Sequence, residues 1–127
     1  MTDLILAIDE GTTSARAMAF DARGREVAMK QIPLDTATPA PGHVEQDPEA
    51  IWRATADAAG AVIAQVGPER IAAVGITNQR ETVVFWDAAT GEALGPAIVW
   101  QDRRGADQCA RLRQAGLEPG IQARTGL

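Results

Sequence analysis

The sequence predicts an α/β domain built on a mixed β-sheet, and three features predict it. Three short segments of strand character, at residues 4–8, 15–20 and 25–32, follow one another closely enough for an antiparallel meander. A long amphipathic stretch with helix-start signals comes next, and an apolar run follows at residues 71–77. A long helix between two apolar strands is typical of a crossover that joins parallel strands. We therefore expect one sheet with both antiparallel and parallel pairs.

Length, charge and cysteine content exclude several functional classes. The chain has 127 residues, 46% of them hydrophobic, and a formal net charge of −5 at pH 7. General nucleic-acid binding needs a basic face, so we expect no nucleic-acid partner. No apolar run reaches the length of a membrane span, and the N-terminus lacks the basic region of a secretory signal. Cys109 is the one cysteine and cannot form an internal disulfide, so we expect a cytoplasmic protein.

The loop between the first two strands carries candidate ligands for a phosphate and a metal ion. Asp9 stands where the first apolar run ends, Gly11 permits backbone angles that other residues resist, and Thr12–Ser14 adds three hydroxyls. The backbone N–H groups of such a loop can surround an anion, and the carboxylate can hold Mg2+ directly or through water. A hairpin turn with a polar tip fits the same residues, so from spacing alone both interpretations stay open.

Arg16 is a cation near the loop end of the second predicted strand. By the two-residue period of a strand, Arg16 shares one face with Met18 and Phe20. The charge therefore lies next to the candidate phosphate loop, at the end of an otherwise apolar face. A solvated charge at the end of a strand is the alternative interpretation.

Helix signals begin at Asp47 and end at Gly67. Asp47 is a suitable N-cap, Pro48 suits the first helical position, and Glu49 places a negative charge at the positive end of the helix dipole. Gly67 and Pro68 end the helix. The predicted core-facing stripe consists of Ile51, Thr55, Ala59, Val62, Ile63 and Val66. A meander followed by a helix and a buried parallel strand opens a ribonuclease H-like domain of the actin-type ATPases, and we expect that fold here in incomplete form.

Polar clusters follow the apolar runs in the second half of the chain. Asn78–Glu81 comes directly after the predicted strand 71–77, where open α/β sheets bind ligands. An exposed polar loop is the alternative. Two runs, 82–86 and 97–100, predict a hairpin, and a helix is expected from about Asp102 to Ala115, before Gly116. Trp100 fits either the hydrophobic core or stacking on the carbon face of a ligand.

Five segments together resemble the N-terminal part of glycerol kinases, in the carbohydrate kinase family that also includes xylulose and gluconate kinases. The Asn-Gln-Arg-Glu-Thr and Trp-Gln-Asp-Arg-Arg motifs are similar to glycerol kinases in particular, because pentulose kinases differ there. The segments occur in family order and extend over essentially the whole chain. They are Asp9–Arg16, Val44–Trp52, Gly75–Thr82, Ala97–Arg104 and Thr125–Leu127.

The resemblance implies an ATP-dependent phosphotransferase that acts on glycerol. It implies that Arg80 and Glu81 hydrogen-bond the glycerol hydroxyls, that Trp100 covers the carbon backbone, and that Asp9 lies near Mg2+. A triol offers donors and acceptors together, so one cation beside one carboxylate can bind both. Phosphoryl transfer depends on positioning and on charge neutralisation, which suits this division of roles. The residues implied to face the phosphate are Gly11, Thr12, Thr13, Ser14 and Arg16.

The sequence departs from the family in two side chains of the loop, at His43, where an aromatic residue is frequent, and in length. Glu10 replaces a usual Gln and Ala15 replaces a common Ser, and Glu10 adds negative charge near the phosphate site. Such kinases have two domains, so residues 1–127 would be the N-terminal part of the substrate- and phosphate-binding domain, with the second, nucleotide-binding domain absent. The general base is expected beyond Leu127, so no residue in this chain is a convincing base, and the isolated chain is expected to be inactive.

Two other functions remain open from the sequence. One is a kinase of another polyol or sugar in the same family, which Arg80, Glu81 and Trp100 make the weaker interpretation. The other is a non-catalytic remnant that serves as a binding or assembly module. Glycerol or a related polyol, ATP and ADP are the expected small-molecule partners, and a homo-oligomer is possible, because a partial domain exposes apolar surface.

Overall fold

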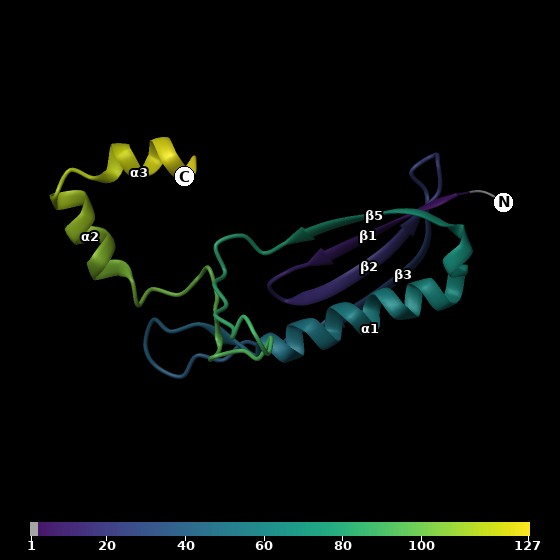
Figure 1. Cartoon of the computed structure of the whole chain (residues 1–127), viewed down its shortest axis with the longest axis horizontal. Helices are drawn as coiled ribbons and strands as arrows, with labels where there is room; N and C mark the ends of the chain where they lie inside the picture. Colours follow the sequence, from purple (N-terminus) through teal and green to yellow (C-terminus); the bar gives the residue numbers. More distant parts are fainter. Residues whose placement is uncertain (1–2) are drawn as a thin grey trace.

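The computed structural model describes residues 3–127, in which one long helix packs against part of one face of a four-stranded sheet (Figure 1). The strand order is β3-β2-β1-β5, with β1–β2 and β2–β3 antiparallel and β1–β5 parallel. The predicted mixed sheet, with its meander, crossover helix and parallel strand, is confirmed. The elements are β1 (Leu4–Glu10), β2 (Ser14–Phe20), β3 (Glu26–Pro33), β4 (Glu45–Gln46), α1 (Pro48–Val66), η1 (Pro68–Arg70), β5 (Ile71–Asn78), β6 (Ala97–Ile98), α2 (Ala106–Gln114) and α3 (Glu118–Thr125).

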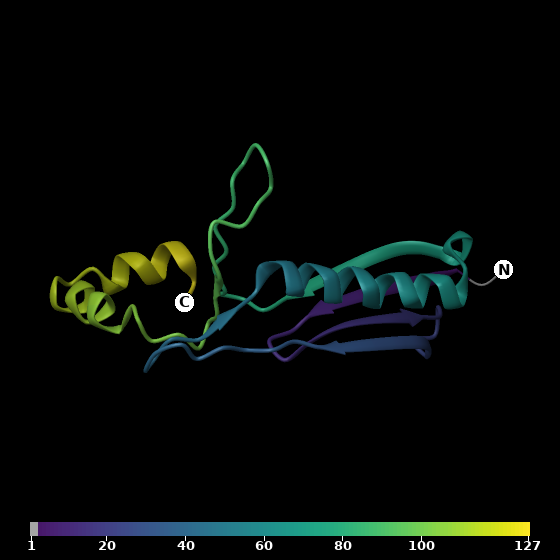
Figure 2. The same cartoon turned by 90° about the horizontal axis from the view of Figure 1, so that it is seen from below.

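Small side chains set the contact between α1 and the sheet. The helix lies along β2 and β3, so that helix and sheet form two layers (Figure 2). On the sheet side, Ala17 and Ala19 of β2 and Ala28 of β3 are buried. On the helix side, the buried residues are Ala54, Ala58, Val62 and Val66. The predicted stripe was correct at Val62 and Val66, and Ala59 and Ile63 pack against the same core. Nearer the start of the helix, Ala54 and Ala58 are the buried residues, and the predicted Ile51 and Thr55 are only partly buried.

The first turn of α1 has the predicted cap. The Asp47 side chain accepts a hydrogen bond from the Glu49 backbone N–H at 2.9 Å, and Pro48 occupies the first turn. At the other end, the Gly67 backbone N–H donates to the Ile63 carbonyl with Gly67 at φ 90°, a conformation that a β-carbon disfavours. Local chemistry alone therefore determines where this helix begins and ends.

We expect Asp47→Ala to destabilise the chain by about 1 kcal/mol, because the mutation leaves a helix N–H without its acceptor. The measurement is urea unfolding followed by circular dichroism. Asp47→Asn is the matched control, because asparagine keeps a capping oxygen and loses only the charge that lies 3.6 Å from Arg53. Equal losses in both mutants would assign the effect to the charge and contradict the cap.

β5 is exposed, which corrects the prediction of a buried strand. Val74 is 55% and Ile76 is 74% exposed, although their register partners Leu6 and Ile8 on β1 contribute to the core. The reason is the position of α1, which packs on β2 and β3 and leaves the outer strand uncovered. β5 is also the last strand in the sheet order, so one of its edges has no strand partner among residues 3–127.

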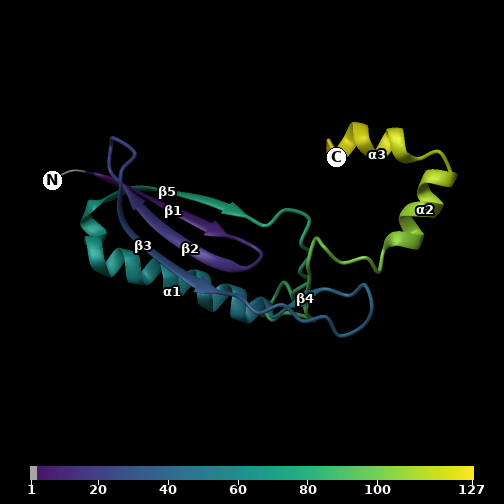
Figure 3. The same ribbon diagram turned by 180° about the vertical axis from the view of Figure 1, so that it is seen from behind.

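The C-terminal third of the chain extends away from the sheet. α2 and α3 project beyond the end of the sheet that carries the β1–β2 loop (Figures 1 and 3). α2 begins at Ala106, four residues later than predicted, because residues 100–101 and 104–105 form turns and Asp102 lies between them outside any helix. Gly116, at φ 71°, follows the helix as expected. The predicted hairpin exists only as isolated bridges, Val83 to Ile98 and Trp86 to Ala93, and β6 pairs instead with β4. Among the described residues, no helix combines the length and apolar character needed to cross a membrane.

Candidate functional site

The β1–β2 loop is a tight turn of three residues, 11–13. The Gly11 backbone N–H donates to the Ser14 carbonyl at 3.0 Å, and a β-carbon on Gly11 would lie 3.1 Å from that same oxygen. Glycine therefore lets the turn close. Thr13 is exposed at the tip, whereas Ser14 is buried and its hydroxyl accepts a hydrogen bond from the Gln31 side chain at 2.8 Å. Of the three hydroxyls predicted to face phosphate, that of Ser14 is thus engaged with β3.

Asp9 and Arg16 are register partners on adjacent antiparallel strands, directly beside this turn. Paired residues of neighbouring strands share a face, so both side chains lie on the face opposite α1. Both are partly buried, and the Arg16 Nε is buried without a hydrogen-bond partner in the described part of the chain. A buried guanidinium N–H that lacks an acceptor marks a place where an anion would be stabilised.

Trp100 joins the loop to the segment that follows β5. Its indole Nε1–H donates to the Thr12 hydroxyl at 2.8 Å, and its backbone N–H donates to the Thr82 hydroxyl at 3.2 Å. The side chain is nevertheless 53% exposed, so much of its surface is open. The core interpretation of Trp100 is therefore wrong. An aromatic residue with its polar edge anchored and apolar surface exposed can cover the carbon face of a ligand.

Two buried glutamines complete the connection, and sequence reasoning missed both. Gln46 is 3% and Gln79 is 8% exposed. The Gln46 Nε2 donates to the Thr12 carbonyl at 2.6 Å, the Gln79 Nε2 donates to the Gln46 Oε1 at 2.9 Å, and the Thr82 hydroxyl donates to the Gln79 Oε1 at 2.9 Å. The only signal for them was their place inside two of the resembling segments, because a lone glutamine has no pattern that predicts burial.

Glu10, the unusual residue of the loop, contacts Gln79. The Gln79 Nε2 donates to the Glu10 Oε1 at 3.1 Å. Burial is the main cause that raises the pKa of Glu10 above its ordinary value, and the neighbouring charge of Asp9 adds to it, whereas hydrogen bonds from Gln79 act in the opposite direction. The Glu10 carboxylate is therefore a half-buried group that interacts with the segment after β5.

Arg80 and Glu81 lie between Gln79 and Thr82, and both are exposed. Neither side chain has a hydrogen bond or an ion pair within residues 3–127. Glu81 has φ 61°, a left-handed conformation that is unfavourable for a residue with a β-carbon. Gln79 and Thr82 are thus anchored on each side of two free charged side chains. The structure does not bring those side chains into contact with Asp9 or the loop.

Asp102 links the segment that follows Trp100 to the segment that precedes Gln46. Its carboxylate accepts the Val44 backbone N–H at 2.7 Å and binds Arg104, whose Nη2 also contacts Glu45 at 2.6 Å. The Asp102 side chain is 3% exposed, so it is not part of an open recognition surface. Hydrogen bonds from Arg104 are the main cause that holds the pKa of Asp102 well below its usual range, with the Val44 N–H adding to them against the effect of burial.

We expect Asp102→Asn to lower the melting temperature at pH 7 and to have a smaller effect at pH 2–3. The pKa of Asp102 is depressed in the folded state, so its stabilising effect is complete above its unfolded pKa of about 3.9 and is lost as the pH falls below that value. Thermal melts of both proteins from pH 7 to pH 2 measure this. Asp107→Asn, on an exposed stretch of α2, is the control. A difference between wild type and Asp102→Asn that stays constant over this range would contradict the assignment.

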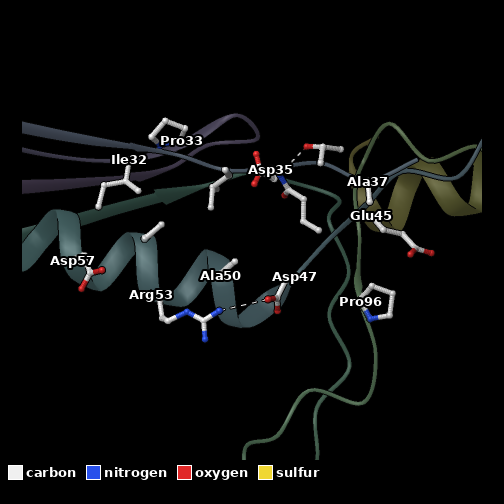
Figure 4. A pocket seen from close by; sticks show the side chains of 14 residues that line it. Ile32, Pro33, Asp35, Ala37, Glu45, Asp47, Ala50, Arg53, Asp57 and Pro96 are labelled. Carbon is white, nitrogen blue, oxygen red and sulfur yellow. Dashed lines mark hydrogen bonds and ion pairs between the residues drawn. The ribbon is translucent and has the colours of Figure 1, made fainter. Parts of the chain in front are cut away.

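A separate open groove of about 660 Å³ lies between the end of β3 and the start of α1 (Figure 4). Its charged lining consists of Asp35, Glu45, Asp47 and Asp57 against one cation, Arg53. This excess of carboxylates does not suit a phosphate. None of the residues predicted to bind phosphate or polyol lines the groove.

The tight turn after β1, the Arg16 Nε without an acceptor in residues 3–127 and the exposed Trp100 thus lie at the same end of the sheet. The chain belongs to the FGGY family of carbohydrate kinases: residues 4–127 match the N-terminal domain of that family. The predicted family membership is therefore confirmed.

Curated relatives of the chain are glycerol kinases. The chain is 53% identical over 129 residues to the glycerol kinase of Methylobacterium nodulans and 51% identical over 129 residues to glycerol kinase 1 of Pseudomonas aeruginosa. Each match covers 100% of this chain and 26% of the relative. The chain thus spans about a quarter of the length of the curated relatives it matches.

Solved structures of the family share the fold. Plasmodium falciparum glycerol kinase with ADP is similar with a TM-score of 0.78 and 31% identity, over 87% of this chain and 22% of that chain. The xylulose kinase of Rhodospirillum rubrum is similar with a TM-score of 0.80 and 27% identity, over 88% of this chain and 23% of that chain. These neighbours agree with the predicted ribonuclease H-like, actin-type fold, of which the chain covers part.

Proposed function

We propose that residues 1–127 form the N-terminal part of the substrate- and phosphate-binding domain of an ATP-dependent glycerol kinase. Within a longer protein, this enzyme would transfer the terminal phosphate of ATP to glycerol and produce glycerol 3-phosphate. The observation that carries the proposal is the 2.8 Å hydrogen bond from the Trp100 indole to Thr12. That bond joins a residue assigned to the polyol to the loop assigned to the phosphate, which is the proximity that phosphoryl transfer needs.

The residues of the loop fit a phosphate and its magnesium ion. The Arg16 Nε lacks an acceptor within residues 3–127. The Gly11 N–H is bonded to the Ser14 carbonyl, so the backbone N–H groups of Thr12 and Thr13 would be the ones to face an anion. In the proposed site Asp9 holds Mg2+, while Arg16 and residues 11–14 hold the phosphate. Magnesium-bound ATP supplies the phosphoryl group and neutralises part of its charge. Asp9 and Arg16 keep opposite charges adjacent on one face of the sheet, which suits a cation and an anion bound together.

In the proposed polyol site, Arg80 and Glu81 hold the hydroxyl groups and Trp100 covers the carbon chain. Both charged side chains are exposed and have no partner among the described residues, so a ligand would not have to break an existing ion pair. Arg80 can donate to hydroxyl oxygens, and Glu81 can accept from hydroxyl protons. Two charged groups that both need partners favour a small molecule with several hydroxyls.

The test uses a longer protein in which residues 1–127 precede the remaining three-quarters of the Methylobacterium nodulans relative. We expect kcat/KM for glycerol to exceed that for xylulose and erythritol by at least about a hundredfold, because hydrogen-bonding sites discriminate strongly between substrates. A preference for xylulose or erythritol would favour the kinase of another polyol or sugar. No turnover with any of the three, while the intact relative is active, would favour a non-catalytic module.

We also expect residues 1–127 to self-associate, which sedimentation velocity at increasing concentration would measure. Val74 and Ile76 expose apolar surface on an uncharged strand, one edge of which has no strand partner among the described residues, and such edges pair readily. Ile76→Lys should shift the distribution toward the monomer, whereas Ile121→Lys on α3 is the control. A monomer at all concentrations would contradict the expectation.

The proposed compartment is the cytoplasm. Cys109 is the one cysteine of the sequence, and a single cysteine cannot form an internal disulfide, which suits a reducing environment.

A further inference from the structure

The polar contacts around Trp100 form a closed ring of five residues from four separate segments. In order, the ring runs through Thr12, Gln46, Gln79, Thr82 and Trp100, and the Trp100 indole returns to Thr12. Its donor–acceptor distances lie between 2.6 and 3.2 Å. The residues come from the β1–β2 loop, β4, the segment after β5 and the segment after β6.

Each amide in the ring has one favourable orientation. The Gln46 Nε2 donates to the Thr12 carbonyl and to the Thr36 hydroxyl, while its Oε1 accepts from Gln79. The Gln79 Nε2 donates to Gln46 and to Glu10, while its Oε1 accepts from Thr82. Rotating either amide by half a turn would place an oxygen against the Thr12 carbonyl or the Glu10 carboxylate. Both side chains use both of their amide N–H donors and accept one hydrogen bond at the amide oxygen, which favours one fixed arrangement.

We propose that Gln46 and Gln79 are positioning residues that hold the β1–β2 loop and the Gln79–Thr82 segment in one fixed relative arrangement. The inference rests on the proposed function, in which the loop holds the phosphate and the segment carries the polyol-binding Arg80 and Glu81. Neither glutamine touches a reacting group. The pair acts through Thr12 on one side and Thr82 on the other, so that the acceptor hydroxyl and the phosphate meet with the correct spacing.

The first test is solvent exchange of the Trp100 indole N–H, measured by NMR on the 127-residue chain. The indole proton binds Thr12 and does not contact Gln79. If the ring acts as one unit, Gln79→Met should speed exchange of this proton by up to about tenfold, the amount expected for loss of one hydrogen bond. Gln31→Met is the matched control, because the Gln31 amide binds Ser14 beside the same loop but lies outside the ring.

Internal probes separate coupling from general destabilisation. The indole protons of Trp52 and Trp86, and the core backbone amides of Leu6 and Val62, should exchange as in wild type. An unchanged Trp100 indole in Gln79→Met would overturn the inference, and so would faster exchange of all these probes together. If Gln79→Met does not fold, Thr82→Val tests the same ring, with the side-chain amide of Gln46 as the readout because Thr82 does not contact it.

The second test is steady-state kinetics of Gln79→Met and Gln46→Met in the longer protein described above. We expect kcat to fall about ten- to a hundredfold, while KM for glycerol and ATP changes by less than about threefold, because positioning matters in the transition state. A raised KM with unchanged kcat would overturn the positioning role. If the longer wild-type protein does not phosphorylate glycerol, the proposed function fails, and the exchange result on the 127 residues still decides the inference.

Discussion

Residues 1–127 by themselves are expected to phosphorylate glycerol at less than about one-hundredth of the rate of the longer protein. The chain offers candidates for the phosphate site, at Asp9 and Arg16, and for the polyol site, at Arg80 and Glu81. The resemblance to the family puts the general base elsewhere, and general-base catalysis is typically worth about 10²–10⁴ in rate. Closure of the site and exclusion of water also require more of the molecule than one sheet and its helix. These losses multiply, so little acceleration remains.

A coupled ADP-release assay on purified residues 1–127, with glycerol present and absent, measures this. The longer protein carrying the same 127 residues is the positive control, and the Asp9→Asn chain shows how much ADP release is unrelated to the site. Glycerol-dependent turnover within about a hundredfold of the longer protein would mean that Asp9, Glu81 or Asp102 supplies the base. The burial of Asp102 and its bonds to Arg104 and Val44 make it the weakest of these three.

Arg80→Ala and Glu81→Ala, made in the longer protein, are expected to impair the use of glycerol far more than the use of ATP. Each mutation removes charge-assisted hydrogen bonds worth about 1.5–3 kcal/mol, which corresponds to about ten- to a hundredfold in kcat/KM. Because Glu81 occupies a left-handed conformation, alanine there keeps the backbone strain and removes only the carboxylate. The effect should therefore report binding of the hydroxyl groups and not relaxation of the loop.

Kinetics with glycerol and ATP varied separately distinguish the two substrates. Arg103→Ala and Glu92→Ala remove the same kinds of charge from exposed positions outside the site and should leave both dependences close to wild type. An unchanged glycerol dependence in both Arg80→Ala and Glu81→Ala would refute the polyol assignment. A selective loss with ATP would move these residues to the nucleotide.

The local signals in the sequence proved reliable because each depends on a few neighbouring residues. Asp47 and Pro48 start α1 through a capping bond and a preset backbone angle, and Gly67 ends it through a conformation that other residues avoid. The turn at Gly11 follows from the same kind of chemistry. The apolar runs before and after this turn predicted β1 and β2. The long helix before the apolar run 71–77 predicted that this strand pairs in parallel with β1.

The sequence failed where burial depends on which surface another element covers. The apolar strand 71–77 has the pattern of a buried strand, yet Val74 and Ile76 are exposed because α1 lies over β2 and β3. The face of α1 was also misjudged, since Ala54 and Ala58 are buried while the larger Ile51 is only partly so. Hydrophobic size ranked these positions incorrectly, because the small residue Ala58 shares the close-packed core with alanines of β2 and β3.

The sequence by itself determined the mixed sheet, the capped helix, the glycine turn after β1 and the membership of a kinase family, since these depend on local spacing and on motifs. Only the tertiary structure decided that Gln46 and Gln79 are buried and that Trp100 binds Thr12. These contacts join residues 33 and 88 positions apart in the chain. A buried amide is stable only when specific partners meet all its donors and acceptors, and those partners come together only after the sheet, β4 and the segment after β6 have assembled.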